Sequence, residues 1–485
     1  MSPSAEPGPI GYDPDEQSWG SATGSRPPFV DRLDGSLTLD QVLLREAGRD
    51  LGRQCEAQPA AVLRPGSVED ICRVMARCDE LGLPVAAQGA AHTVGGQRLV
   101  EGGIAIDMTV LKDVSADDFA PDYSYIDVPA GILWADLVPL LISHEVQFAG
   151  GMTGYLGLSV GGTLSVGGVS NMPQVGAQVD YVLGLEVVVA NGTRLWCSAT
   201  EHPDLFDSAR AGLGQAGIVT RARLQLTPAP PTVASVVIVY DALAAAFAGM
   251  RAACSQPAVD EAFVMIMPPQ PGGAPLFHLH VACYGSDGID VLGNAIDKLP
   301  ASAGSSQMQV LKMRDHLCQF TRQIDQWRRE GWDDRIKPWF DIFLPENTAE
   351  SFVGDRLGEM TEADWSDQGF VLIFPHLRSA FRSPGLALPD PVDPGNRNEI
   401  VYLFDVLNVS PGTASAAYQA DQEARNEHWM SEGRKAGGKI YPIGAMNPRT
   451  FDWRAHYGTS WPDVLAGRQR YGSPRLTPGL CMPRD

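Results

Sequence analysis

A histidine in a glycine-rich turn is the first residue of this sequence that could do chemistry. His92 lies within Gln88-Gly-Ala-Ala-His-Thr-Val-Gly-Gly-Gln97. A neutral imidazole that is held in place is a competent nucleophile. The turn also offers backbone N–H groups at close range, and such groups bind a pyrophosphate without positive side chains. A histidine that only packs or forms a hydrogen bond is the alternative reading of these residues.

A second glycine-rich stretch, residues 150–168, is interleaved with hydroxyl side chains. Its eight glycines let the backbone approach a ligand, and the hydroxyls supply hydrogen bonds. The hydroxyl residues of the stretch and just beyond it are Thr153, Ser159, Thr163, Ser165 and Ser170. Apolar residues at alternate positions from Leu156 to Val166 argue against a mobile linker. We expect a packed backbone wrapped around something polar and extended.

A third glycine pattern, Gly212-Leu-Gly-Gln-Ala-Gly217, has the spacing GxGxxG. A dinucleotide-binding Rossmann turn should follow a strand, and an acidic residue should lie about twenty positions further on. This pattern follows a helical segment and has no such acidic residue. We therefore do not interpret it as a Rossmann turn.

Composition excludes several classes of function. The net charge is −21 and no Lys/Arg run forms a basic patch, so a nucleic-acid partner is not expected. No apolar run approaches about 18 residues, so no membrane span is expected. The eight cysteines form neither a CxxC pair nor a zinc-spaced cluster, which predicts no metal site. With no secretory signal in sight, we expect reduced thiols in a cytoplasmic protein.

The pattern of apolar residues predicts two structural units. The proline-rich segment 227–232 marks the boundary between them, and residues 1–27 read as a loosely ordered, flexible arm. In the first unit we expect a helix over residues 68–83 and strands at 84–87, 103–107, 125–129, 183–190 and 194–197. In the second unit we expect strands at 234–240, 262–267, 277–283, 339–344, 370–374 and 400–409, with helices at 243–252 and 416–436. Strands alternating with helices in this way favour an α+β unit with an antiparallel sheet.

Several motifs, in one order along the chain, resemble the FAD-binding module of the vanillyl-alcohol-oxidase superfamily, and most closely the cytokinin dehydrogenases. Residues 88–97 resemble RGxGHSxxGQ, 161–169 resemble GGTLSNAGI, and 213–220 resemble LGQFGIIT. Residues 338–345 resemble PWLNLFVP, and 456–458 and 471–479 resemble HFG and YDPxxLLSPG. The resemblance extends over nearly everything after the N-terminal arm.

The resemblance implies a two-domain, PCMH-type FAD-binding fold of the α+β class. Residues 28–230 and a returning C-terminal segment, 440–485, would form the FAD domain, and residues 231–439 an antiparallel-sheet substrate domain. The flavin contacts carried over from the motifs are Gly89, Ala91, His92, Thr93, Gln97, Gly154, Ser159, Ser165, Val169, Ile218, Tyr441 and Thr477. His92 would bond covalently to the flavin. Because no cysteine lies between Cys78 and Cys197, a second covalent bond of the bicovalent kind is not expected.

The departures from the family pattern matter most for function. The TDYL motif of cytokinin dehydrogenases, whose aspartate is the catalytic base, corresponds to Thr153-Gly-Tyr-Leu156. Gly154 cannot accept a proton through a side chain. Ala91 replaces the turn glycine before the histidine, Gln88 replaces the arginine that opens the motif, and Leu480 replaces the glutamine after the final PG. We infer a flavin site that is kept and a substrate site that is rebuilt.

Acidic and phenolic side chains on the strands of the second unit are the candidates for the missing base. They are Glu261, Asp341, Tyr402 and Asp405. Asp341 interrupts the apolar strand around Trp339-Phe-Asp-Ile-Phe, where a buried carboxylate would need a role or a partner. A strand residue that faces solvent or forms a salt bridge is the alternative. His376 and His456 are further candidates, the latter within a structural-looking motif.

The leading hypothesis is an FAD-linked oxidase or dehydrogenase of a small organic molecule. It would remove a hydride from a C–H next to nitrogen or oxygen and pass electrons to oxygen or another acceptor. A true cytokinin dehydrogenase is an alternative that Gly154 disfavours. A flavin-binding protein that catalyses a cyclisation or isomerisation without net redox change is the other alternative.

Overall fold

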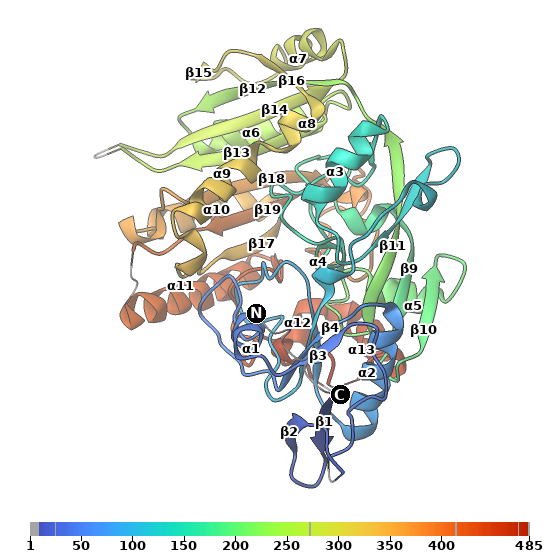
Figure 1. The fold of residues 1–485 in the computed structure, drawn as a ribbon. Helices are drawn as coiled ribbons and strands as arrows, with labels where there is room; N and C mark the ends of the chain where they lie inside the picture. The colour runs from blue at the N-terminus through green and yellow to red at the C-terminus, as the bar shows by residue number, and fades with distance from the viewer. Residues whose placement is uncertain (1–8, 25, 271–272, 413–414, 474, 484–485) are drawn as a thin grey trace.

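The computed structural model describes residues 9–24, 26–270, 273–412, 415–473 and 475–483. Two regions with separate sheets face each other, and the chain crosses between them after β11 (Ile218–Pro228), since β12 (Thr232–Tyr240) begins the second (Figure 1). The boundary read from the prolines at 228–231 thus coincides with a change of sheet.

The first region contains a small sheet of mixed direction. Its strand order is β3 (Ser36–Thr38), β4 (Ala61–Arg64), β6 (Ile104–Asp107) and β5 (Val85–Gln88). Two of its three strand pairings are parallel, namely β4 with β6 and β6 with β5. Helices α1 (Gln41–Ala47) and α2 (Val68–Leu81) accompany this sheet.

Helix α2 shows why the expected helix forms where it does. Ile71, Val74 and Cys78 recur at three- and four-residue spacing and are buried, so one face packs on the sheet. The helix ends at Gly82, whose φ of +69° suits a glycine C-cap. The prediction of a helix from residue 68 is confirmed, and its end comes two residues earlier than expected.

A second sheet of the first region is antiparallel and has five strands. Its order is β10 (Arg194–Ser198), β9 (Val182–Val188), β11 and β7 (Tyr125–Pro129), with β8 (Val146–Phe148) also on β11. Helices α3 (Trp134–Ser143), α4 (Val160–Val166) and α5 (Pro203–Ala209) pack with it. The glycine and hydroxyl stretch therefore contains a short helix, α4, which its alternating apolar residues did not predict.

The second region is built on a nine-stranded antiparallel sheet. From one edge its order is β15 (Gly304–Ser305), β12, β14 (Leu276–Tyr284), β13 (Glu261–Met267), β18 (Phe370–Leu377), β19 (Ile400–Leu407), β17 (Phe340–Pro345) and β20 (Lys439–Ile440), with β16 (Gln309–Lys312) also on β12. Each of the six strands expected from the sequence is present.

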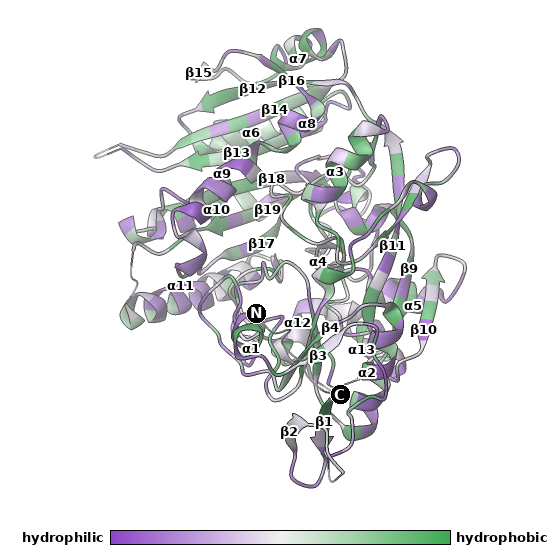
Figure 2. Cartoon of the chain, viewed as in Figure 1, coloured by the Kyte–Doolittle hydropathy of each residue, from purple (hydrophilic) through white to green (hydrophobic). Residues whose placement is uncertain are grey.

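Helices cover one face of this sheet and leave the other toward the first region. The covering helices are α6 (Leu243–Cys254), α7 (Gly288–Ile296), α10 (Glu346–Glu359) and α11 (Ala416–Lys435). Helices α8 (Met313–Leu317) and α9 (Gln319–Arg329) lie on the chain between β16 and β17. Figure 2 shows hydrophobic residues along β12 and β14 and hydrophilic residues along α9 and α11.

The last part of the chain returns to the first region. The N–H of Val85 donates to the carbonyl of Arg475 at 2.9 Å, and the N–H of Thr477 donates to the carbonyl of Val85 at 2.9 Å. Helix α13 (Trp461–Tyr471) packs on α5, and α12 (Trp453–Tyr457) precedes it. The segment near residue 475 therefore pairs with β5, the edge strand of the small sheet.

The N-terminal segment differs from its expectation. Strands β1 (Ile10–Asp13) and β2 (Ser18–Ser21) form an antiparallel hairpin. The rings of Tyr12 and Trp19 lie 4.8 Å apart, and those of Trp19 and Phe29 lie 4.9 Å apart. This aromatic cluster orders the hairpin, so a flexible arm is the wrong description of residues 9–24. Residues 1–8 and 25 lie outside the described residues.

A buried carboxylate fixes the start of α2. The side chain of Asp70 accepts from the N–H groups of Asp34, Gly35 and Gly66 at 2.8, 2.8 and 2.9 Å, and Arg73 lies 3.3 Å from it. Asp70 is 0% exposed, so its carboxylate relies on these N–H groups and on Arg73 in place of water.

Replacing Asp70 with Ala should lower the free energy of unfolding by about 3 kcal/mol, because three N–H donors and Arg73 lose a charged acceptor. Urea denaturation of the two proteins measures the difference. Asp79→Ala, at an exposed position of the same helix, is the control and should change stability by less than about 0.5 kcal/mol. Equal losses in the two variants would contradict this account of Asp70.

Candidate functional site

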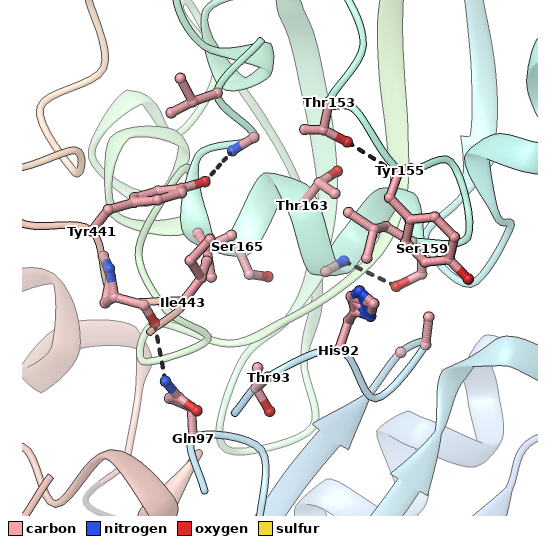
Figure 3. Close-up of a pocket in the computed structure, with 18 of the residues that line it drawn as sticks. His92, Thr93, Gln97, Thr153, Tyr155, Ser159, Thr163, Ser165, Tyr441 and Ile443 are labelled. Carbon is pink, nitrogen blue, oxygen red and sulfur yellow. Dashed lines mark hydrogen bonds between the residues drawn. The ribbon is translucent and has the colours of Figure 1, made fainter. Parts of the chain in front are cut away.

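A cavity of about 350 Å³ lies between the two regions. Its walls come from the glycine turn at 89–93, the stretch 153–169, the loop 213–219, the C-terminal residues 476–480 and the open face of the large sheet. Figure 3 shows its polar side chains on both sides of α4, with His92, Tyr155 and Ser159 on one side and Tyr441 on the other. All twelve residues expected at a flavin line this one cavity.

His92 lies in a box of aromatic and cationic side chains. Its ring stacks on Tyr155 with centroids 4.8 Å apart, and Trp339 meets it edge-on at 5.8 Å. Burial, with the positive charges of Arg328 and Lys337, lowers the pKa of His92 to about 3. The imidazole is therefore neutral at physiological pH, which is the nucleophilic state.

The partners of His92 are themselves held in place. Arg328 Nη1 donates to the Tyr155 hydroxyl at 2.7 Å, so the ring that stacks on His92 is anchored. Lys337 Nζ lies 4.3 Å from the ring centre of Trp332 and donates to the carbonyl oxygens of Trp332 and Arg335 at 2.6 and 2.8 Å. Burial lowers the pKa of Lys337 to about 7.

A backbone cradle beside His92 depends on glycine. A Cβ atom on Gly89 would collide with Ser159 Oγ, and one on Gly162 would lie 2.8 Å from the same oxygen. Ser159 Oγ accepts from the N–H of Gly162 at 3.3 Å at the start of α4. Ala91 stands in the turn with a φ of +60°, a left-handed conformation in which the family pattern has glycine.

The far end of the cavity ties the C-terminal segment to the glycine turn. Gln97 Nε2 donates to the carbonyl oxygens of Gly444 and Pro442 at 2.8 and 3.3 Å. The N–H of Gly168 donates to the Tyr441 hydroxyl at 3.1 Å. These contacts hold the turn at 441–444 against α4 and the glycine turn.

The residues present fit an FAD. The hydroxyl of Thr93 is buried in the cavity wall, and no described residue forms a hydrogen bond with it. A Cβ on Gly214 would lie 2.7 Å from Thr477 Oγ1. The absence of a side chain on Gly214 therefore lets the Thr477 hydroxyl lie close to the backbone. Neutral donors and glycine backbone along one elongated wall suit a pyrophosphate flanked by two ring systems.

The candidate bases are divided between three places. Asp405 lines the cavity, and Asp341 is its registered partner on the adjacent strand. Glu261 lies instead in an outer chamber of about 740 Å³, which shares Gly154 and Phe263 with the inner cavity. There its carboxylate lies 2.9 Å from His316 Nε2 and accepts from the Tyr284 hydroxyl.

The structure places Tyr402, a candidate base, away from the cavity. Successive residues of β19 point to opposite faces, and Leu403, Asp405 and Leu407 are the ones that line the cavity. Tyr402 faces the helices, where its ring lies 4.9 Å from that of Phe247. It is therefore not placed to act on a substrate in the cavity.

The two candidate histidines also lie away from the cavity wall. His376 is 0% exposed and packs against Phe381 at 5.3 Å. His456 packs among Phe451, Trp453 and Tyr457. Both serve as packed core histidines in this fold.

The cationic and aromatic box around His92 was missed from the sequence. Helix α9 brings Phe320, Ile324 and Trp327 to the cavity on one apolar stripe, and Arg328 next to it. The three- and four-residue spacing of that stripe is a signal for a buried helix face. Nothing in the spacing shows that this helix brings Arg328 to Tyr155, which stacks on His92.

Within the described residues, no group of three or more His, Cys, Asp or Glu side chains is arranged to hold a metal ion. None of the helices in the described part of the chain is long and apolar enough to span a bilayer.

Two family descriptions match the chain. Residues 59–198 match "FAD binding domain", and residues 276–480 match "Cytokinin dehydrogenase 1, FAD and cytokinin binding". Cytokinin dehydrogenase 3 of Oryza sativa subsp. japonica is 30% identical over 483 residues, which cover 90% of each chain. An uncharacterized oxidoreductase of the fasciation locus in Rhodococcoides fascians is 27% identical and covers 93% of this chain and 100% of its own.

Solved structures share the fold. The 6-hydroxy-D-nicotine oxidase of Arthrobacter nicotinovorans superposes with a TM-score of 0.70 at 16% identity, over 92% of this chain and 96% of that one. The carbohydrate oxidase of Microdochium nivale gives 0.68 at 16% identity, over 93% and 96%. The expectation of an α+β, PCMH-type fold with an antiparallel-sheet second domain is confirmed by this likeness.

The pair formed by Glu261 and His316 predicts a pH-dependent stability. Burial alone would lower the pKa of His316, but the carboxylate of Glu261 outweighs it and raises that pKa above its usual range. Burial likewise opposes ionisation of Glu261, yet His316 and Tyr284 hold the pKa of that carboxyl below its usual range. The stabilisation of the folded protein by protonated His316 beside Glu261 is thus complete below about pH 6.5. It is lost as the pH rises through the raised pKa of His316.

His316→Gln should therefore destabilise the protein by about 2 kcal/mol at pH 6 and by less at pH 9. Unfolding midpoints across this pH range, for both proteins, measure the difference. His428→Gln is the control, since the exposed His428 lies 3.6 Å from Glu359 and such pairs contribute little. A pH-independent loss in His316→Gln would contradict the charged pair.

Proposed function

Because the chain belongs to the cytokinin dehydrogenase family of FAD-dependent oxidoreductases, we propose that it carries FAD covalently on His92 and oxidises a small organic substrate at a C–H bond next to nitrogen or oxygen. Bound FAD supplies a two-electron acceptor for the hydride of that bond. Electrons then pass to oxygen or another acceptor.

The neutral, buried His92 at the end of the cavity carries this proposal. Its pKa of about 3 leaves one ring nitrogen unprotonated, and Tyr155 restrains the ring by stacking. Both properties favour attack on an electrophilic carbon of a bound ring system. A histidine with only a packing role would have no need of the anchored Tyr155–Arg328 pair behind it.

The other cavity residues have binding roles in this proposal. The hydroxyls of Ser159 and Thr477 lie beside glycine backbone, and that of Thr93 is buried without a partner among the described residues. All three line the cavity and can donate to phosphate oxygens. Gln97 and Tyr441 fix the segment that closes the far end. The buried aromatic side chains of the wall, among them Trp327, Trp332 and Trp339, would exclude water from the reacting atoms.

The outer chamber gives the substrate a way in. Phe263, Phe320 and Phe370 line both the chamber and the inner cavity, so an apolar constriction separates them. The chamber beyond is polar, with Glu261 and His316 on its wall. We propose that the oxidised end of a small molecule passes the three rings and that its polar end remains in the chamber.

The His92 bond is tested by denaturing the purified yellow protein in acid and measuring peptide masses. The peptide that contains His92 should retain the mass of FAD, and His92→Ala should lose it. Thr93→Ala is the control, because it alters the same wall without removing the nucleophile. Free release of FAD from the wild-type protein would rule out the covalent bond, and a protein that takes up no flavin would contradict the whole proposal.

Turnover is tested with a panel of isopentenyladenine (a cytokinin), benzyl alcohol and N-methylbenzylamine, each with a C–H next to nitrogen or oxygen. Bleaching of the flavin absorbance with formation of hydrogen peroxide, or of a reduced acceptor, supports the proposal. A product with the mass of the substrate would instead favour the non-redox alternative.

Gly154 predicts weak activity toward a cytokinin. A Cβ at this position meets only Phe320, at 3.8 Å, so a larger side chain has room between chamber and cavity. Gly154→Asp should raise the rate of cytokinin oxidation by about 100-fold or more, the usual contribution of a positioned general base. Stopped-flow bleaching measures it, with Gly154→Asn as the control of equal size. Equal rates in the two variants would show that a carboxylate here is not what limits the reaction.

A further inference from the structure

Two carboxyl groups face each other in the middle of the large sheet. Asp341 of β17 and Asp405 of β19 are directly opposite in the antiparallel register, so their side chains share one face. They are 1% and 5% exposed. The pair lies on the face that looks toward the first region, as Leu403 and Leu407 do.

No cation balances this pair within the described residues. Neither carboxyl takes part in an ion pair there, and no N–H or O–H of another described side chain donates to either oxygen of Asp341 or to Oδ1 of Asp405. Two ionised carboxylates can only accept hydrogen bonds, and burying both charges would cost several kcal/mol. One proton held between them removes one charge and supplies the missing hydrogen bond.

The pKa directions agree with a shared proton. Burial raises the pKa of both carboxyls, and the neighbouring charge raises that of Asp341 further. A hydrogen bond from Asp341 offsets part of the rise at Asp405. Asp341 is therefore the group that keeps the proton, and Asp405 is the one that ionises first.

Only Asp405 opens into the cavity. Asp341 lies behind it, covered by the segment 441–446: a Cβ on Gly444 would lie 2.5 Å from Asp341 Oδ2, and the N–H of Tyr441 donates to the Asp341 carbonyl at 2.9 Å. The pair thus has one face toward a ligand and one closed face.

Asp405 stands midway along the sheet wall. In register, Leu407 pairs with Phe370, Asp405 with Leu372, and Leu403 with Phe374. Trp339, next to the first of these rows, contacts His92, whereas Phe343 in the last row packs against Tyr441 at 5.5 Å. The row of Asp405 therefore lies between the His92 end and the Tyr441 end of the cavity, about 7 Å from each neighbouring row of the same facing.

The other titratable groups on the cavity wall are not placed to accept a proton at the row of Asp405. Those that line the cavity are His92, Arg98, Tyr155 and Tyr441. Tyr441 is the one beside the pair, and burial raises the pKa of its phenol. On the β18 side the neighbour is the apolar Leu372, and on the segment over Asp341 it is Gly444.

We propose that Asp341 and Asp405 share one proton and that the Asp405 carboxylate is the proton acceptor for the substrate's N–H or O–H group, with Asp341 as its positioning residue. This inference rests on the proposed function. The substrate's N–H or O–H bond breaks and its proton goes to Asp405. The electron pair left behind forms the C=N or C=O bond, and the adjacent C–H bond breaks with its two electrons as a hydride that goes to the bound FAD, the oxidant. The substrate class is an amine or alcohol with a hydrogen on both atoms of the bond that is oxidised.

The shared proton is tested by infrared spectroscopy of the holoenzyme at neutral pH. The wild-type protein should show the carbonyl-stretch band of a protonated carboxyl that the double variant Asp341→Asn/Asp405→Asn lacks. Asp364→Asn is the control, because Asp364 is buried but ionised, with Arg425 at 2.6 Å. A spectrum without a band difference between wild type and double variant overturns the shared proton, whatever the flavin content.

The catalytic role is tested by the pH dependence of flavin bleaching with the three panel substrates. Asp405→Asn should slow bleaching by about 1,000-fold. Asp341→Asn, which still donates a hydrogen bond, should stay within about tenfold of wild type. Asp341→Leu should move the acid limb of the profile to higher pH, because the Asp405 carboxylate loses its donor and remains buried.

The outcomes separate the two claims. An acid limb that is unchanged in Asp341→Leu, or bleaching that survives in Asp405→Asn, overturns the role given to the pair. Bound FAD that no panel substrate bleaches in the wild-type protein, with the infrared band present, overturns the proposed function and with it the catalytic role of Asp405, but not the shared proton.

Discussion

Desolvation of ionisable groups between the two regions is the constraint on which the site depends. A charge that has left water must find a partner, give up its proton or take one up. His92 is neutral, Lys337 has a pKa of about 7, and the two sheet carboxyls lie too close to carry two charges. The same burial that could have disabled these groups gives each a protonation state suited to nucleophilic or proton-transfer chemistry.

The antiparallel register of the large sheet determines which side chains face the cavity and which face the helices. Because side chains alternate between faces, Leu403, Asp405 and Leu407 line the cavity, while Tyr402, Phe404 and Val406 pack under the helices. A shift of one residue would exchange the two sets. The helices that cover the far face therefore determine indirectly which acid meets the cavity.

The sequence predicted the site best where glycine and hydroxyl positions determine the local backbone. The motifs that resemble the flavin-binding family named twelve residues, and all twelve line one cavity, while the period of two predicted the strands of the sheet. It did not reveal which face of β19 is open, because both faces of this strand are buried and apolar alternation is lost. The box of Arg328, Trp332 and Lys337 around His92 and the N-terminal hairpin depend on contacts between distant or weakly patterned segments, which no local period encodes.

The return of the C-terminal segment to β5 has a consequence for biosynthesis. Val85 exchanges two backbone hydrogen bonds with residues 475 and 477, and Gln97 binds residues 442 and 444. The cavity wall of the first region is thus complete only when the C-terminal segment is present. Contacts of such sequence separation form late and slowly. FAD would therefore meet a complete wall only after the residues near 477 have been synthesised.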